Sequence, residues 1–326
     1  MACRVAELLL LAAIAAAAAE GSNARAPATE ADLRYWLENM VWYHGFSVQE
    51  IQAATGLSQA EILQASKKFD ISPATRPDRA AAAPLLVLPY PGGRHPRLGF
   101  LDGAINPRRE TKVSVFTPWD QQSYVVIDVP EAIWSNLGLT YLAHAHVPTL
   151  WTERKIELEK REWNRRADGT LDMDRKLPNG IGFGAKVVPA TNAVRLELWL
   201  RNGTGETLRD LRVQNCVMLK GAKGFDVQTN DNKVFSSPYV ACRSADGKRW
   251  IITAWEPCHR VWANPPVPCL HSDPKFPDCA PGETQRLRGW LSFYEGTNID
   301  DEFRRIDRTG WRQVDRPATQ SSGDGQ

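Results

Sequence analysis

The sequence predicts a mainly β protein, in which a large antiparallel β-sandwich follows a small module of three helices. Residues 194–201 alternate apolar and polar side chains, which is typical of a strand with one buried face. Similar short runs recur up to residue 294 with turn residues between them, which favours a sandwich over a parallel α/β sheet. Upstream, residues 29–70 carry apolar residues at helical spacing and two capping boxes. We place the sandwich at residues 85–306.

The chain begins with a predicted signal peptide, residues 1–19. Residues 8–19 are twelve apolar positions behind Arg4, too few to cross a bilayer, which takes about 20. Cleavage after Ala19 fits, and cleavage after Ala26 is the alternative. We therefore expect a periplasmic or secreted protein with no membrane span after cleavage, because no later apolar run approaches that length.

The helical module is expected to begin with a helix from Thr29, its N-cap, to about His44, with Gly45 as its stop. Two short helices follow, starting at the capping boxes of Ser47 and Ser58. Residues 47–68 resemble a helix-turn-helix motif at Ser47, Ile51, Ala54, Gly56, Leu57, Ser58 and Ile62. Their second helix offers no arginine, and the formal net charge is only +2. We therefore predict a packing module and no nucleic-acid partner.

A Pro/Ala-rich linker, residues 71–84, precedes the strands, and residues 316–326 form a polar tail expected to be disordered. We expect the turn 202–205 to connect strand 194–201 to a return strand, residues 208–218, as a hairpin. Residues 158–178, rich in Glu, Arg and Asp, are interpreted as a solvated hairpin. The remaining expected strands cover residues 112–116, 123–129, 139–146, 156–163, 181–188, 249–255 and 285–294.

Five cysteines remain after cleavage, and an oxidising compartment favours disulfides between them. The expected pairs are Cys269 with Cys279 and Cys216 with Cys242, which leaves Cys258 free, although the sequence does not settle the connectivity. The stretch 255–279 also contains His259 and His271. A zinc site there is the alternative to a disulfide-stapled loop.

The candidate chemistry centres on His144 and His146, which would project from one face of a strand. They could act as base on a sugar, with Glu256 as the acid partner and Trp119 or Trp255 stacking on the ring. The same two histidines could instead bind a metal ion. No nucleotide-binding, zinc-protease or serine-hydrolase motif occurs, so the sequence identifies no cofactor and leaves catalysis open.

Residues 179–218 and 281–294 resemble the β-supersandwich of galactose-mutarotase-like proteins. In the first segment, the resemblance lies in a strand, the turn Asn202-Gly203-Thr204 and a return strand. In the second, it lies in a closing strand that follows Pro281-Gly282-Glu283. The resemblance implies a carbohydrate ligand. Mutarotases carry a histidine near the strand that here reads Gln214–Met218, which has none. The resemblance therefore implies the scaffold rather than the mutarotase reaction, and a structural or purely binding sandwich is the alternative.

Overall fold

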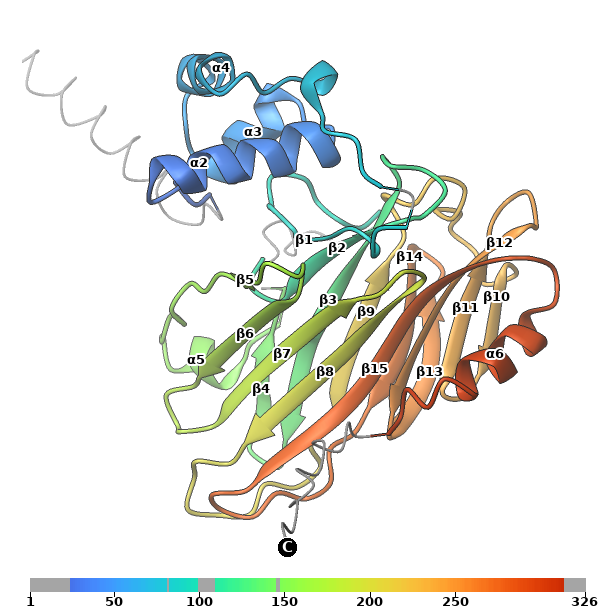
Figure 1. The fold of residues 1–326 in the computed structure, drawn as a ribbon. Helices are drawn as coiled ribbons and strands as arrows, with labels where there is room; N and C mark the ends of the chain where they lie inside the picture. The colour runs from blue at the N-terminus through green and yellow to red at the C-terminus, as the bar shows by residue number, and fades with distance from the viewer. Residues whose placement is uncertain (1–23, 81, 99–108, 145–146, 314–326) are drawn as a thin grey trace, which may run out of the picture.

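The computed structural model describes residues 24–80, 82–98, 109–144 and 147–313. Its strands form two antiparallel sheets that face each other, with a helical module at one end (Figure 1). This confirms the predicted fold class. In the described ranges, no helix is both long and apolar enough to span a membrane.

Sheet 1 has seven strands in the order β1-β2-β3-β9-β14-β13, with β4 paired to β3. The bounds of its strands are β1 Val87–Pro89, β2 Lys112–Phe116, β3 Tyr124–Ser135, β4 Gly138–Leu142, β9 Val213–Met218, β13 Cys258–Asn264 and β14 Val267–Pro274. Sheet 2 has eight strands in the order β10-β11-β12-β15-β8-β7-β6-β5. Their bounds are β5 Asn164–Arg165, β6 Leu171–Lys176, β7 Gly182–Pro189, β8 Ala193–Arg201, β10 Lys233–Ser236, β11 Tyr239–Arg243, β12 Arg249–Glu256 and β15 Thr284–Glu295.

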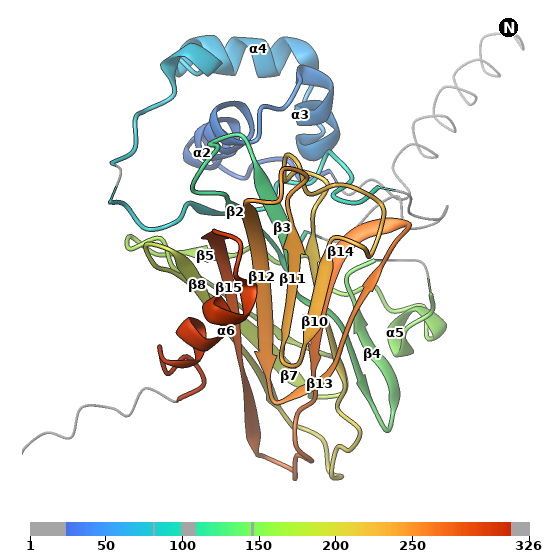
Figure 2. The ribbon, with the colours of Figure 1, turned by 90° about the vertical axis from the view of Figure 1, so that its right-hand side faces the viewer.

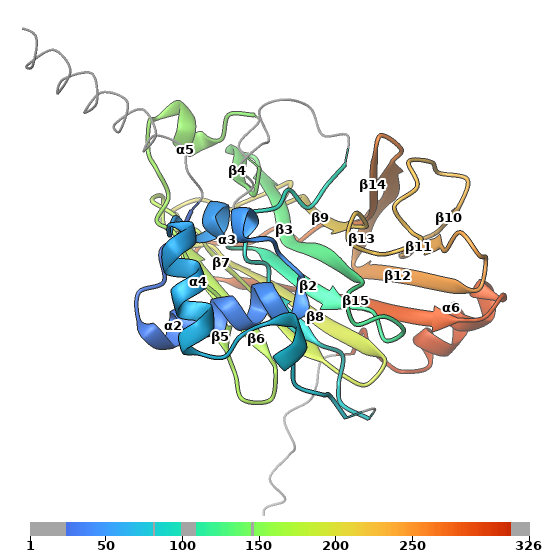
Figure 3. The same ribbon diagram turned by 90° about the horizontal axis from the view of Figure 1, so that it is seen from above.

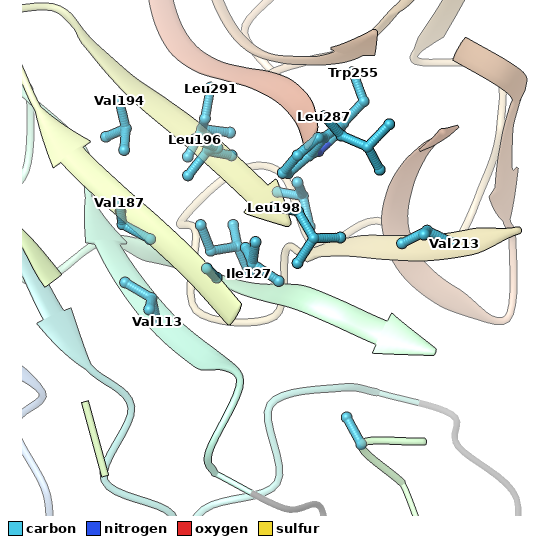
Figure 4. Close-up of a cluster of buried hydrophobic side chains, with 14 of the residues drawn as sticks. Val113, Ile127, Val187, Val194, Leu196, Leu198, Val213, Trp255, Leu287 and Leu291 are labelled. Carbon is cyan, nitrogen blue, oxygen red and sulfur yellow. The ribbon is translucent and has the colours of Figure 1, made fainter. Parts of the chain in front are cut away.

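The main core lies between the sheets (Figure 4). Ile127 of sheet 1 and Leu196 and Leu198 of sheet 2 contribute alternate residues of their strands to it. Burying each such side chain contributes about 1.5–3 kcal/mol. The other residues of these strands point outward, so each sheet also has an outer face on which polar side chains can gather.

The helical module consists of α2 (Glu30–Leu37), the π-helical turn η1 (Glu38–Tyr43), α3 (Val48–Thr55) and α4 (Gln59–Lys68). Both predicted capping boxes form, at Ser47 with Glu50 and at Ser58 with Glu61. The module lies over one end of the outer face of sheet 1 (Figure 2). Its apolar side chains form a second core with that face, including Trp36, Leu37, Met40, Phe116, Tyr124, Val126 and Met218.

Three smaller helical segments complete the fold: η2 (Pro73–Thr75), α5 (Leu150–Glu153) and α6 (Ile299–Asp307). α6 lies against the outer side of sheet 2 near β12 and β15 (Figure 3). Phe303 and Ile306 form a third core there with Ile252 and Trp290. The short turn η2 lies within the predicted linker, residues 71–84.

Several expected elements differ from the structure. Residues 156–163 form no strand, although the hairpin predicted within 158–178 exists as β5 and β6. The turn 202–205 does not close a hairpin, because β9 joins sheet 1 while β8 lies in sheet 2. The Asn202 side chain donates to the carbonyls of Glu206 and Cys279, which fixes the crossover between the sheets. Residues 258–274, expected to be a stapled loop, form the β13-β14 hairpin.

Candidate functional site

Polar side chains cross sheet 1 on its outer face, next to the helical module. Lys112 of β2 pairs with Asp128 of β3, which pairs with Cys216 of β9. Directly paired residues on antiparallel strands project from the same face. Continuing the β9-β14 register by one residue from Leu270↔Val217 brings His271 opposite Cys216. Four neighbouring strands therefore bring ionisable groups into one row.

At one end of this row lies a buried ionic cluster made of Arg97, Lys112, Asp128, Glu131 and His144. Lys112 Nζ donates to Asp128 Oδ1 at 2.7 Å, and His144 Nε2 lies 3.2 Å from Asp128 Oδ2. Arg97 Nη2 donates to Glu131 Oε1 at 2.5 Å. All five residues are buried. The pairs provide the compensation that buried charges require.

The electrostatics of this cluster keep His144 neutral. Burial, together with the neighbouring Lys112 and Arg97, lowers the pKa of His144 well below its ordinary value. A neutral imidazole beside the acceptor oxygen of Asp128 carries its proton on Nε2. For Glu131, burial raises the pKa, but the neighbouring basic groups, Arg97 foremost, together outweigh burial and lower that pKa to about 2. The arrangement is therefore a carboxylate-oriented histidine, as used for general base catalysis, but one without exposed surface.

The same cluster could hold a metal ion by distance, since ligand atoms of Asp128, Glu131 and His144 lie within 4.8 Å of one another. Two fixed cations argue against it. Lys112 and Arg97 already bind one oxygen of each carboxylate and would repel a metal ion. The metal prediction for His144 and His146 is untested, because His146 lies outside the described residues.

Further along the row lies a thiol-imidazole cluster formed by Cys216, Cys269 and His271. Their ligand atoms lie within 4.8 Å of one another, and Cys269 Sγ is 3.2 Å from His271 Nε2. Asp273 Oδ1 lies 3.7 Å from His271 Nδ1. Burial opposes a charge on His271, yet the Cys216 sulfur and the Asp273 carboxylate raise its pKa to about 10. The Trp262 ring stacks on the imidazole, with centroids 3.9 Å apart.

A third site, accessible from the surface, lies on the outer face of sheet 2. β7 presents two glycines there, Gly182 and Gly184, and so leaves a trough between β6 and β8. Lys176, Gly182 and Arg201 pair in one row across the three strands. Asp174, Gly184 and Trp199 pair in the next row. The indole of Trp199 covers Gly184, and the open part of the trough lies over Gly182. We call the cavity lined by Asp174, Lys176, Gly182, Trp199 and Arg201, and by Gly203 and Thr204 at its end, the Trp199 groove; its volume is about 480 Å³.

The indole of Trp199 lies against the backbone of β7 because Gly184 has no side chain. A Cβ at Gly184 would lie 2.6 Å from Trp199 Cε2, which real contacts do not allow. Asp174, Lys176 and Arg201 are exposed. Among the described residues, none of these three has an ion-pair partner. The groove thus combines a flat aromatic ring with unpaired charged groups, within the size range of ligand sites.

The structure does not bring the predicted site residues together. His144 lies in the ionic cluster on sheet 1, whereas Glu256, the last residue of β12, forms a 3.5 Å ion pair with Arg312. Trp255 is only 2% exposed and belongs to the core between the sheets, so stacking on a ligand there is wrong (Figure 4). Trp119 packs against Phe225 and Phe293.

Both predicted disulfides are wrong, since all five described cysteines are free. Cys242 belongs to the core between the sheets, whereas Cys216 belongs to the core beneath the helical module. Cys279 likewise lies in the core between the sheets, and Cys269 on the opposite face of sheet 1. The sheet therefore separates the members of each proposed pair, and it brings Cys216 close to Cys269 instead.

Sequence reasoning missed several of these residues, although some carried a signal. Asp128 and Glu131 interrupt an otherwise apolar strand, a pattern that indicates paired buried charges. Gly182 and Gly184, two residues apart, indicate a gap on one face of a strand. In the alternation of residues 194–201, Trp199 falls on the same face as Arg195, Glu197 and Arg201, and the structure places it on that less buried face.

No family model matches this chain, and no curated protein matches it. The solved structures that it resembles include a putative kojibiose phosphorylase from the human microbiome, at 7% identity and a TM-score of 0.34 over 59% of this chain. A polysaccharide lyase gives 12% identity and a TM-score of 0.35 over 69%. The Slr1438 protein of Synechocystis gives 11% and 0.35 over 58% of this chain and 88% of its own. The chain spans 26% of the phosphorylase and 34% of the lyase, and likenesses this distant assign neither family nor function.

Proposed function

We propose that this protein is an exported carbohydrate-binding protein and that the Trp199 groove holds the saccharide. The observation that carries the proposal is the Trp199 indole, which packs against the bare backbone at Gly184 and lines a groove that Gly182 leaves open. A flat apolar ring suits the C–H face of a pyranose, and neighbouring charged groups suit its hydroxyls.

The charges of the groove favour an anionic saccharide. Lys176 and Arg201 flank Gly182 across the sheet, and Asp174 is the one carboxylate of the groove among the described residues. A uronic acid carboxylate would meet two unpaired cations there. Arginine offers it a bidentate contact, which a neutral hydroxyl cannot use equally well.

The test is binding to a panel of neutral and uronate-containing oligosaccharides, measured by calorimetry. We expect Trp199→Ala to weaken binding by about 30-fold, which is about 2 kcal/mol. Trp134→Ala is the matched control, because Trp134 is also a half-buried strand tryptophan but lies on sheet 1. Equal affinity of the Trp199→Ala and wild-type proteins for every saccharide bound would reject the groove as the site.

The charge preference needs its own variants. Lys176→Gln and Arg201→Gln should weaken the binding of uronate-containing oligosaccharides more than that of neutral ones, and added salt should do the same to the wild type. Equal losses for both classes would contradict an anionic ligand while leaving the stacking role of Trp199 intact.

The apolar run Leu8–Ala19 supports export, and the contacts of Arg25 favour one of the two cleavage sites. Arg25 Nη2 lies 2.7 Å from Glu110 Oε1, and Arg25 also donates to the Arg161 carbonyl and to Glu162. Cleavage after Ala26 would remove these contacts, whereas cleavage after Ala19 would keep them. The proposed mature chain therefore begins at Glu20.

A second candidate function is acid–base chemistry on a sugar at His144. The neutral imidazole beside Asp128, with Glu131 Oε1 3.9 Å from Nε2, favours it. Because the cluster is buried, a substrate would have to open it, so we rank binding at the Trp199 groove first. Replacing His144 and His146 by Ala should abolish any turnover of the oligosaccharide panel while leaving binding at the groove unchanged. Turnover that survives in the double variant would reject this chemistry.

A further inference from the structure

We infer that Cys216, Cys269 and His271 form a binding site for a thiophilic metal ion, Zn²⁺ or an ion of similar preference. The three residues come from two adjacent strands, β9 and β14. Cys269 and His271 are two residues apart on β14 and so project from one face. The register brings Cys216 opposite His271 on the same face.

The distances suit one ion bound to all three residues. In a tetrahedral zinc site, bond lengths of about 2.3 Å to sulfur and about 2.0 Å to nitrogen separate these ligand atoms by about 3.5 Å. Here Cys269 Sγ and His271 Nε2 are 3.2 Å apart, and the Cys216 sulfur lies within 4.8 Å of both. A shift of the Cys216 side chain toward the other two ligands would complete the geometry. The fourth position of the ion remains for water or another donor.

Asp273 supplies the outer partner that metal-bound histidines usually have. Its Oδ1 lies 3.7 Å from His271 Nδ1, the nitrogen that faces away from the thiols. This separation is too long for a hydrogen bond, and Nδ1 has no hydrogen-bond partner among the described residues. A small shift of the ring toward Asp273 would let Nδ1 donate to this carboxylate and leave Nε2 free to bind metal. Arg260 Nε and Trp262 Nε1 both donate to the other oxygen of Asp273, at 2.8 and 2.6 Å. The carboxylate nearest to Nδ1 is therefore itself held in place.

The charge environment distinguishes this cluster from the ionic cluster beside it. There, Lys112 and Arg97 bind the carboxylate oxygens directly. At the thiols, no Lys or Arg side chain of the described residues donates to either sulfur; burial acts to raise the pKa of both thiols, and the nearby charge of Arg97 acts to lower it. When the ion binds, two metal–sulfur bonds and one metal–nitrogen bond form. The thiol protons and the imidazole proton leave to solvent, and no oxidant is required.

A disulfide between Cys216 and Cys269 is the competing state, and strand geometry disfavours it. Cys216 lies opposite His271, and Cys269 lies opposite Met218, so the two cysteines are diagonal neighbours. Diagonal residues on adjacent strands have Cα atoms about 7–8 Å apart. An unstrained disulfide requires less than about 7 Å. A metal ion bridges the longer span without moving the strands.

The first experiment is titration of the reduced, metal-free full-length protein with Co²⁺ as a spectroscopic probe for zinc. We expect about one Co²⁺ per chain, with a sulfur-to-cobalt charge-transfer band in the near ultraviolet and visible bands of a tetrahedral ion. Zn²⁺ should displace it. Cys216→Ser, Cys269→Ser and His271→Asn should each weaken or abolish the signal. Cys242→Ser is the matched control, because Cys242 is a buried cysteine on β11 of sheet 2, in the core between the sheets. An unchanged cobalt spectrum in the Cys216→Ser/Cys269→Ser variant overturns the inference.

A second measurement on the wild type avoids variants that fail to fold. Alkylation during partial unfolding is mapped by mass spectrometry with and without Zn²⁺. We expect zinc to protect Cys216 and Cys269 and to leave the rate at Cys258 unchanged. Equal rates at all cysteines with and without zinc, or a Cys216–Cys269 disulfide in the native protein that binds no metal after reduction, would overturn the site. These readouts do not depend on saccharide binding.

Discussion

Lys112 Nζ lies 2.7 Å from Asp128 Oδ1, and neither side chain has any exposed surface. The two residues are directly opposite each other on β2 and β3. A buried ion pair adds little stability by itself, but losing one partner leaves an uncompensated charge. This pair therefore makes the outer face of sheet 1 sensitive to single substitutions.

Lys112→Met should lower the free energy of unfolding by about 3–5 kcal/mol. Adding Asp128→Asn should restore part of this loss, because the double variant buries no unpaired charge. Chemical denaturation of both variants measures the coupling. Lys223→Met is the control, since Lys223 and Asp120 form a more exposed pair worth at most about 1 kcal/mol. Additive losses in the double variant would show that the two side chains do not interact.

Gly182→Ala should weaken saccharide binding, whereas Gly184→Ala should lower the stability of the fold. A Cβ at Gly182 meets Trp199 at an ordinary 3.6 Å, so this variant should keep its stability but fill the trough and weaken saccharide binding about tenfold. A Cβ at Gly184 lies 2.4 Å from the Met173 carbonyl oxygen, and the strain should cost about 1–3 kcal/mol of stability. Thermal unfolding and calorimetry separate the effects. If the Gly182→Ala variant binds saccharide as strongly as the wild type, the trough is not part of the binding site.

His44 should make the attachment of the helical module to sheet 1 sensitive to acid. Burial lowers the pKa of His44 to about 3, and Arg94 adds to this, although the Asn39 carbonyl favours the charged ring. The neutral ring bonds the Asn39 carbonyl through Nδ1 and Ser114 Oγ through Nε2. Because the pKa is lower folded than unfolded, the stabilisation is complete above pH 6.5 and is lost as the pH falls toward 3. The free energy of unfolding should fall by up to about 1.4 kcal/mol for each pH unit in this range.

His44→Gln should unfold with a shallower pH dependence than the wild type between pH 6.5 and 4, although it is less stable at neutral pH. Denaturant unfolding at several pH values measures both slopes. His259→Gln, at an exposed histidine, should keep the wild-type slope. Parallel curves for the wild type and His44→Gln would mean that His44 does not govern this loss.

Arg25 should contribute to the stability of the mature protein. Its side chain is 10% exposed and pairs with Glu110, which is 2% exposed. Arg25→Ala should cost about 1–3 kcal/mol, whereas Arg34→Ala, at an exposed helical pair with Glu38, should cost about 0.5 kcal/mol or less. Intact-mass analysis of exported protein should give a chain beginning at Glu20. A chain beginning at Pro27 would contradict the proposed cleavage.

Alternation and capping predict much of the fold because both depend on neighbouring residues. The helices after Ser47 and Ser58 follow from their capping boxes, and β2 matches its predicted bounds. The partner of each strand does not follow, because pairing depends on distant residues. The turn at Asn202 therefore looked like a hairpin, although it connects the two sheets.

The candidate sites were predictable only in part, for the same reason. His144 was recognisable as a candidate by its type and spacing, but its partner Asp128 lies on another strand. The closeness of Cys216 to Cys269 depends on the β9-β14 register, which no local sequence pattern encodes. Trp199 and the two glycines become a groove only when β7 and β8 align.

Gly182 and Gly184 are one two-residue step apart on β7, a distance of about 7 Å. The Trp199 groove covers only the end of this step and continues to Gly203 and Thr204, so it holds a short stretch of saccharide rather than a long chain. Each protein molecule would then hold a polymer by a few units at most, with modest strength and rapid release. Firm attachment to a polysaccharide would need many copies acting on one strand of polymer, with the local concentration of neighbouring units supplying the avidity.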